Sequence, residues 1–416
     1  MSMQNIMVEE WFTVENFKCN VEIERPERYK NNTTFKISEK KEERLELVYR
    51  MNDGLVLVTG QENEFDSETV IGLYEIGKLY IEYKKLKAKK KTSKAKVKLK
   101  EAENKLCEYI KTFGFFVPVP EGQWTEYKSE RLLRLVERYC VTMELKQEIS
   151  LGKDINYKRL FELTFFLVFA VDPIIEYWNG ESDKDDKDQC DYSVGGSWAE
   201  KSRWVRHGKI VWSDLLYNVV EFKEIDGEEL NFVINRERDK LKGYKYYENE
   251  KEIYNLIKII HEENENDNIA DFLWGFVNDV CPICKINVDG TIEQKLGDAL
   301  RENKYFQSKY KDRLIKIAKD VCAKEISNGI KKAIPACNPN TMNLDVKVPN
   351  LLTALYLALF YFGQKGDTYH ICMCEECRRI FKLEEGARPR KYCGDYCMRR
   401  AAKSHNNHKK SKKNLE

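Results

Sequence analysis

Four cysteines near the C-terminus have the spacing of metal ligands. They form two pairs, Cys374 with Cys377 and Cys393 with Cys397, separated by fifteen residues. A two-residue spacer lets a tight turn aim both thiolates of the first pair at one point, and a three-residue spacer matches one helical turn. Zinc accepts such a set because it needs only four ligands at tetrahedral corners. The pattern predicts one zinc ion held in a closed shell of sulfurs, with a structural role.

Other ligands are possible at two of the four positions. Cys372 could replace Cys374 as the first ligand, and His405 or His408 could compete for the fourth place. We expect the set of Cys374, Cys377, Cys393 and Cys397, because it pairs the shortest spacer with the spacing of a helix start.

The residues between the cysteine pairs fit a small metal-binding finger. Residues 378–383 can form a strand with Phe381 as a small core, residues 384–387 supply a turn, and residues 388–392 return to the second pair. A basic helix over residues 398–413 is expected to follow. This order of turn, hairpin and helix start is treble-clef-like.

A family resemblance rests on these same residues. The segment Cys374-x2-Cys377-x3-Phe381, followed by Arg388-x-Arg390-Lys-Tyr-Cys393-x3-Cys397-x-Arg399, resembles the C-terminal zinc finger of the bacterial CGNR family. The tetrapeptide that names the family reads Cys397-Met-Arg-Arg400 here. The resemblance covers about residues 370–413 and implies a zinc site and DNA binding in a transcription regulator. The body that precedes the finger resembles no family that we can name.

Positive charge gathers at the same end of the chain. Residues 370–416 hold 13 Lys and Arg against 6 Asp and Glu, although the formal charge of the whole chain is only +2. Some of these cations could offset the negative charge of a tetrathiolate centre, but the excess predicts contact with DNA or RNA phosphates. A protein-docking role, as in a defence-type adaptor, and a merely solubilising tail are the alternatives. The predicted nucleic-acid contacts are Arg388, Arg390, Lys391, Arg399, Arg400, Lys403, Lys409 and Lys410.

A second basic stretch lies far from the cysteines. Ten lysines and no acidic residue occur between Lys84 and Lys100, within a pattern that becomes helical from Ser67. We interpret it as a helical hairpin with Thr92 and Ser93 near its tip. Its lysines suit either a solvated surface, which we favour, or a nucleic-acid contact.

The remaining pattern predicts a mainly helical α+β fold. Helical periodicity occurs over residues 129–149, 156–171, 250–280 and 296–332, and Asn350 can cap an apolar helix over residues 351–362. Short β-like runs such as residues 55–59 lie near the N-terminus. We expect three regions: a mixed N-terminal region over 1–115 with the lysine-rich hairpin, a helical body over 116–366, and the finger over 367–416.

Composition and apolar patterning restrict the expected cellular location of the protein and its broad class. Neither of the most apolar stretches, residues 163–171 and 351–362, reaches the roughly 20 residues that cross a bilayer. The N-terminus lacks a basic start followed by an apolar run, so no secretory signal is expected. Thirteen cysteines in 416 residues are too sparse for a secreted disulfide framework. We expect a reduced cytoplasmic protein that does not enter a membrane.

Two weaker candidate sites remain. Cys281 and Cys284 form another pair with a two-residue spacer, which could belong to a second metal site. Asp214, Glu221 and Lys223 resemble a fragment of a metal-dependent nuclease site. Similar Glu-x-Lys triplets recur throughout this highly charged chain, so we assign no catalytic residue and expect a non-enzymatic protein.

Overall fold

The computed structural model describes fourteen segments and single positions of the 416-residue chain. They are residues 11–25, 33–50, 56–59, 68–88, 90–119, 124–169, 261, 268–280, 300, 304–337, 344–361, 369–374, 377–382 and 390–403. Within them the protein is mostly helical with a smaller share of strands, so the predicted mainly helical α+β class is confirmed. None of the described helices is long and apolar enough to cross a membrane.

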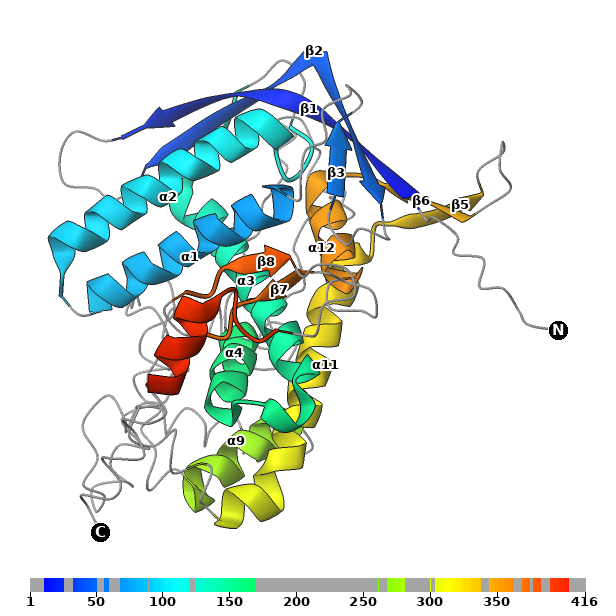
Figure 1. Ribbon diagram of the computed structural model, residues 1–416. Helices are drawn as coiled ribbons and strands as arrows, with labels where there is room; N and C mark the ends of the chain where they lie inside the picture. The colour runs from blue at the N-terminus through cyan, green and yellow to red at the C-terminus, as the bar shows by residue number, and fades with distance from the viewer. Residues whose placement is uncertain are drawn as a thin grey trace, which may run out of the picture. The chain divides into compact units, whose positions relative to one another are not determined.

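A six-stranded sheet is built from both ends of the chain (Figure 1). Its strands are β1 (Trp11–Glu24), β2 (Thr34–Arg50), β3 (Val56–Thr59), β4 (Thr125–Lys128), β5 (Ile334–Cys337) and β6 (Leu344–Val348). The order is β3-β2-β1-β6-β5, and β4 pairs with β2. The β1–β6 pair is parallel, with Phe12 opposite Val346, whereas the other pairs are antiparallel. The β-like run over residues 55–59 is therefore confirmed as β3.

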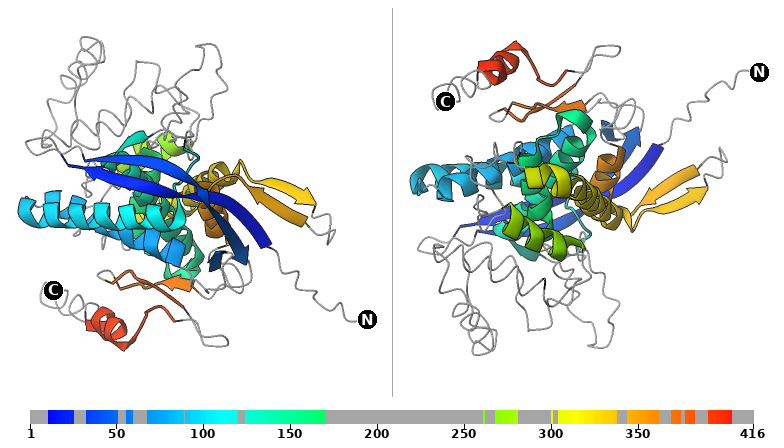
Figure 2. Two further views of the ribbon diagram at one scale, coloured as in Figure 1. Left: turned by 90° about the horizontal axis from the view of Figure 1, so that it is seen from above. Right: turned by 90° about the horizontal axis from the view of Figure 1, so that it is seen from below.

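The lysine-rich segment forms the predicted helical hairpin. Helix α1 (Glu68–Ala88) is followed by α2 (Thr92–Phe113), and the two helices lie side by side (Figures 1 and 2). Helix α2 packs against β1, and Phe35 and Ile37 of β2 are fully buried. Helix α2 has one apolar face, so residues such as Leu106 and Ile110 are buried while most of its lysines are exposed.

Close helix packing is visible at two glycines. Helix α3 (Ser129–Ser150) passes so near α1 that a methyl group on Gly77 would lie 2.2 Å from the Cys140 sulfur. Helix α12 (Leu351–Tyr361) packs equally tightly against Gly329, and its Tyr356 ring meets Tyr139 edge-on at 5.6 Å. The Asn350 side chain accepts a hydrogen bond from the Thr353 backbone N–H at 2.9 Å, so the predicted N-cap is confirmed.

The remaining helices share an aromatic core. Its rings come from α4 (Tyr157–Phe169), α9 (Asn268–Asp279) and the π-helical turn η5 (Phe306–Tyr310). Helix α11 (Lys311–Ile330) has no aromatic residue and continues directly from η5. A short 3-10 turn, η2 (Gly152–Asp154), links α3 to α4. Phe161 stacks on Phe276 at 4.8 Å, and Phe165 stacks on Phe272 at 5.8 Å. These rings are buried because an apolar stripe at helical spacing faces inward on each helix.

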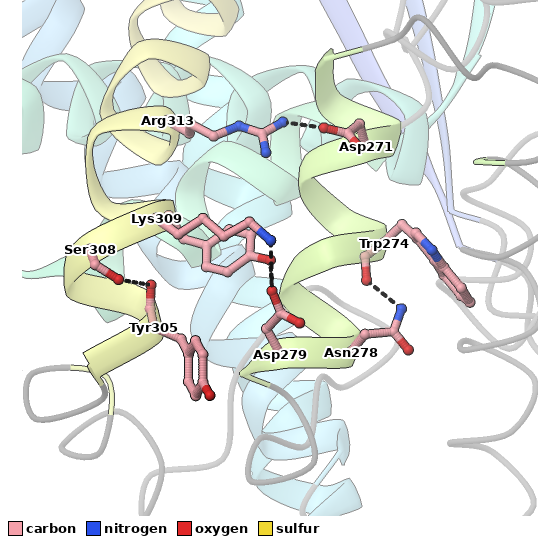
Figure 3. A network of polar contacts seen from close by, with 9 residues as sticks. Asp271, Trp274, Asn278, Asp279, Tyr305, Ser308, Lys309 and Arg313 are labelled. Atoms are coloured by element: carbon pink, nitrogen blue, oxygen red, sulfur yellow. Dashed lines mark hydrogen bonds and ion pairs between the residues drawn. The ribbon is translucent and has the colours of Figure 1, made fainter.

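Polar contacts fasten α9 to η5 and α11 (Figure 3). The Arg313 guanidinium donates to the Asp271 carboxylate at 2.6 Å, and Lys309 pairs with Asp279 at 2.9 Å. The Tyr310 hydroxyl also donates to Asp279. These two donors hold the pKa of Asp279 below its ordinary value, the tyrosine contributing more. These contacts link α9 to η5 and α11 beside the aromatic core.

Two compact units divide the described residues. The first gathers those up to Met143 and from Gly329 onward, and the second gathers those between Glu144 and Asn328. Each unit therefore draws on segments far apart in sequence. The predicted regions 1–115, 116–366 and 367–416 follow sequence order and composition, and they stay a prediction.

Candidate metal centre

A short strand pair forms the base of the C-terminal finger. Strand β7 (Tyr369–Ile371) pairs with β8 (Ile380–Lys382), in the register Tyr369 to Lys382. Ile380 is buried, and Phe381 packs against the cysteines as the predicted small core. The strand predicted over residues 378–383 is confirmed as β8, but its partner precedes the first cysteines. Residues 390–392 are instead joined to this base by the Met373 N–H, which donates to the Lys391 carbonyl at 2.9 Å.

The first cysteine pair is joined by a tight turn. The backbone N–H groups of Cys377 and Arg378 both donate to the Cys374 carbonyl at 3.0 Å. Arg378 has a φ of 44°, a left-handed conformation that is uncommon for residues other than glycine. These hydrogen bonds close a tight turn of the kind expected for a two-residue spacer, and β8 begins two residues after Arg378.

The second pair lies at the start of a helix, which spans residues 395–403 and is called the C-terminal helix here. The Met398 N–H donates to the Gly394 carbonyl at 3.1 Å, so Cys397 lies in the first turn. The prediction of a helix start between Cys393 and Cys397 is confirmed. Residues 404–413 of the predicted basic helix lie outside the described residues.

Four sulfurs converge at the centre of the finger. The ligand atoms of Cys372, Cys377, Cys393 and Cys397 all lie within 4.8 Å of one another. The Cys393 sulfur is 3.6 Å from that of Cys377 and 3.6 Å from that of Cys397. Zinc–sulfur bonds of about 2.3 Å at tetrahedral angles place sulfurs about 3.8 Å apart. The spacing and chemistry of these sulfurs therefore fit a tetrahedral metal ion.

This group differs from the predicted ligand set in one member. Cys377, Cys393 and Cys397 are brought together, but Cys372 occupies the place expected for Cys374. Cys374 remains close by, since it is 6% exposed and packs in the same buried cluster as Cys372 and Cys397. The carbonyl of Cys374 accepts the hydrogen bonds that close the turn, while the Cys393 N–H lies 3.4 Å from the Cys372 sulfur. Cys372 is the alternative that the sequence offered.

The thiols of the metal-free finger have different pKa values, because each is buried to a different degree and hydrogen-bonds different neighbours. Burial acts to raise the pKa of Cys377, but hydrogen bonds from the Arg379 backbone, the thiols of Cys393 and Cys397 and the Arg379 side chain outweigh it. They lower this pKa to about 7. Burial raises the pKa of Cys393 and, more strongly, that of Cys397, where hydrogen bonds to neighbouring sulfurs add to the increase. A bound cation would reverse this preference for protonated sulfur, because metals bind the thiolate form.

Two cations from different parts of the chain contact Cys377. The Lys78 ammonium of α1 donates to the Cys377 carbonyl, and the Arg379 guanidinium hydrogen-bonds the Cys377 sulfur. A cavity of about 500 Å³ lies beside them, lined also by Tyr74, Tyr396 and Arg400. Sequence reasoning did not select Lys78 or Arg379. Adjacency to Cys377 could have indicated Arg379, whereas nothing local connects Lys78 with a cysteine 299 residues away.

The described basic residues of the predicted interface are exposed. They are Arg390, Lys391, Arg399, Arg400 and Lys403. Arg400 donates to the Tyr396 hydroxyl at 2.9 Å along one face of the C-terminal helix. Arg388, Lys409 and Lys410 lie outside the described residues.

The other sequence candidates are not placed by the structure. Cys281 and Cys284, together with Asp214, Glu221 and Lys223, lie outside the described residues. Cys322, a cysteine downstream of that pair in the sequence, is buried on α11, and burial raises its pKa to about 12. Searches against protein-family models, curated proteins and solved structures found no match to this chain.

Fold and site together define a class in broad terms. The protein is mostly helical, of the α+β type, and carries a C-terminal group of four cysteines that could bind a metal ion.

Proposed function

We propose that this chain is a cytoplasmic zinc-binding protein that contacts DNA or RNA through its C-terminal finger in a regulatory role. The observation that supports the metal proposal is the convergence of four sulfurs at distances suited to a tetrahedral ion. Zinc is the proposed ion because four thiolates at tetrahedral corners are its usual structural site. With all four positions taken by sulfur, the ion would hold the finger together and leave no position for a reacting water.

Charge and exposure support the nucleic-acid proposal. The C-terminal helix begins at the sulfur cluster and presents Arg399, Arg400 and Lys403 to solvent. Its only acidic residue over 395–403 is Asp395, in the first turn. Arginine and lysine side chains on such a helix bind phosphate oxygens and release counterions, so affinity would fall steeply with salt.

The metal proposal is tested by measuring zinc content in the purified full-length protein. We expect one zinc per chain, with loss of that zinc in Cys393→Ser, because Cys393 adjoins the sulfurs of both Cys377 and Cys397. Cys281→Ser should leave this zinc in place. Two zinc ions in the wild type, one of them lost in Cys281→Ser, would contradict the single-metal proposal.

The nucleic-acid proposal is tested by fluorescence anisotropy across a salt series. The probes are a random-sequence DNA duplex and a single-stranded RNA, and the protein is the zinc-loaded full chain. Replacement of Arg399, Arg400 and Lys403 by glutamine should weaken binding. Replacement of Lys316, Lys319 and Lys324, three exposed lysines of α11, is the charge-matched control. Absence of binding to both probes at low salt would exclude this function.

A second candidate function is docking of a protein partner on the finger. The C-terminal helix exposes two large apolar side chains, with Tyr396 at 72% and Met398 at 50% exposure. Such residues are typical of contact surfaces, although single exposed apolar side chains also occur without a partner. This alternative predicts that a specific protein co-purifies with the chain after nuclease treatment and is lost from Tyr396→Ala/Met398→Ala.

A further inference from the structure

The end of the α1–α2 hairpin carries a concentrated positive charge. This region, called the hairpin tip, comprises residues 85–96. Its exposed lysines are Lys85, Lys87, Lys90, Lys91, Lys94 and Lys96. Two helix ends and their connection thus bring six cations to one end of the hairpin.

The acidic residues of the described hairpin leave the charge of four of these lysines without a partner. Acidic partners lie nearer the base, where Lys84 pairs with Glu137 at 2.8 Å, Lys98 with Glu82 at 3.4 Å and Lys105 with Glu75 at 3.3 Å. The chain has no Asp or Glu between Glu82 and Glu101. Within the described residues, the structure gives Lys90, Lys91, Lys94 and Lys96 no acidic partner.

Lys90 occupies a position that normally selects glycine. The Lys91 N–H donates to the Leu86 carbonyl and the Lys90 N–H to the Lys87 carbonyl, both at 2.9 Å, which is the Schellman pattern that ends a helix. Lys90 is the left-handed residue of this motif, with a φ of 55°. A lysine is strained there, whereas glycine is not. The tip therefore holds a cation at the expense of backbone stability.

The start of α2 departs from a second local preference. Helix N-termini carry partial positive charge, so acidic residues and side-chain caps stabilise them and lysines do not. Lys91 is the N-cap of α2 and makes no side-chain capping bond, and the first turn contains no acidic residue. Lys94 and Lys96 follow directly. Two departures from local preference at one place, each adding positive charge, are typical of a functional surface.

We propose that the hairpin tip is a second nucleic-acid-contacting surface that binds the phosphate backbone alongside the finger. This inference rests on the proposed nucleic-acid-binding function. Helix α1 contacts the finger through Lys78 and ends at Ala88. At 1.5 Å per residue, the tip lies about 15 Å further along α1, on the order of four to five base pairs of duplex. One duplex or structured RNA can span both surfaces.

The chemistry of the tip favours nucleic acid over a lipid surface. Among the described residues 85–96 there is no exposed large apolar side chain, and Val97, which follows them and is 66% exposed, is a single aliphatic residue. Membrane-surface helices combine lysines with an apolar face that enters the headgroup region, and the tip lacks such a face. The absence of exposed aromatic rings there also favours backbone contact over base stacking, so we expect sequence-independent binding with strong salt dependence.

The test compares two quadruple variants of the full-length, zinc-loaded protein. One replaces Lys90, Lys91, Lys94 and Lys96 by glutamine, and the control replaces the exposed Lys153, Lys316, Lys319 and Lys324. On a 30-base-pair random DNA duplex, the hairpin variant should bind at least about tenfold more weakly at low salt. The slope of log K against log salt should fall in magnitude by about 2 to 4, and the control should change neither. Equal affinities of the two variants would overturn the inference.

A single substitution distinguishes the contribution of the Lys90 charge to DNA binding from the effect of Lys90 on stability. Lys90→Gly relieves the left-handed strain, so we expect a higher melting temperature together with DNA binding weakened by about twofold to tenfold. Raised stability with unchanged affinity would contradict a contact at Lys90. A merely solvated hairpin would give that result.

Comparison of the wild type with the finger and hairpin variants distinguishes failure of the inference from failure of the proposed function. If the wild type binds neither DNA nor RNA, both fail. If substitutions in the finger weaken binding and the hairpin variant does not, the inference alone fails. If Cys393→Ser loses zinc but keeps lysine-dependent binding, the hairpin contact stands and the finger contact fails. Hairpin-dependent binding to phosphatidylserine vesicles that exceeds binding to DNA would assign the tip to membranes and overturn the inference.

Discussion

The ammonium of Lys78 donates a hydrogen bond to the backbone carbonyl of Cys377, joining α1 to the turn of the finger. Burial lowers the pKa of Lys78, while the nearby Cys377 sulfur acts in the opposite direction. A cation against a cysteine-rich centre can offset the negative charge that a tetrathiolate metal site carries. This contact couples the position of the finger to the long hairpin.

Lys78→Met should loosen the finger while leaving the metal ligands in place. Methionine fills a similar volume but cannot donate, so the Cys377 carbonyl loses its partner and the thiolates lose a nearby charge. We expect faster amide hydrogen exchange in residues 377–382, with zinc stoichiometry unchanged. Lys105→Met removes an exposed pairing with Glu75 and serves as the control. Identical exchange in the two variants would show that the Lys78 contact does not hold the finger.

Cys372→Ser and Cys374→Ser should differ in zinc content. The four-sulfur group includes Cys372, whereas Cys374 contributes its carbonyl to the turn. We therefore expect loss of zinc in Cys372→Ser and one bound zinc in Cys374→Ser, measured by mass spectrometry of the native protein. The reverse result would restore the ligand set expected from cysteine spacing alone.

Zinc affinity should rise with pH. The pKa values of Cys393 and Cys397 are raised in the metal-free finger, so both sulfurs are protonated at neutral pH and must release protons on binding. Each displaced proton contributes about tenfold in affinity per pH unit below the thiol pKa, giving about a hundredfold for two. Calorimetry in two buffers of different ionisation enthalpy would count the protons. Fewer than two released at pH 7 would show that the thiols of Cys393 and Cys397 are already ionised in the metal-free finger.

Gly329→Ala should destabilise the protein through a specific overlap. An added methyl group would lie 2.1 Å from the Tyr356 ring at its Cγ atom, and that ring is fully buried against Tyr139. We expect a loss of about 1–3 kcal/mol in the free energy of unfolding, measured in urea. Gly72→Ala is the matched control, because it is also helical and its nearest contact is an ordinary 3.6 Å. There the better helix propensity of alanine should leave stability unchanged or higher.

Local signals in the sequence predicted most of the helices. Periodicity and caps located α1, α3, α4 and α12, since an apolar stripe and an N-cap such as Asn350 act within a few residues. The sheet could not be predicted in the same way. Strands β1 and β6 pair although they lie far apart in sequence, and the local pattern of residues 344–348 does not indicate which strand they pair with.

The finger was predictable where spacing alone controls geometry. The turn after Cys374, strand β8 and the helix start at Cys397 all follow from short-range constraints. The choice between Cys372 and Cys374 does not, because it depends on which sulfur the strand pair aims at the centre. Lys78 could not be found either, since its role depends on the packing of α1 against the finger.

The parallel pairing of β1 with β6 has a consequence for biosynthesis. Phe12 leaves the ribosome long before its partner Val346 has been made. At about 5–20 residues per second, β1 lacks this neighbour for on the order of twenty seconds to a minute. During that time the open edge of β1 presents unpaired backbone N–H and C=O groups that can pair with a strand of another chain. Closure of the sheet is necessarily a late event in folding.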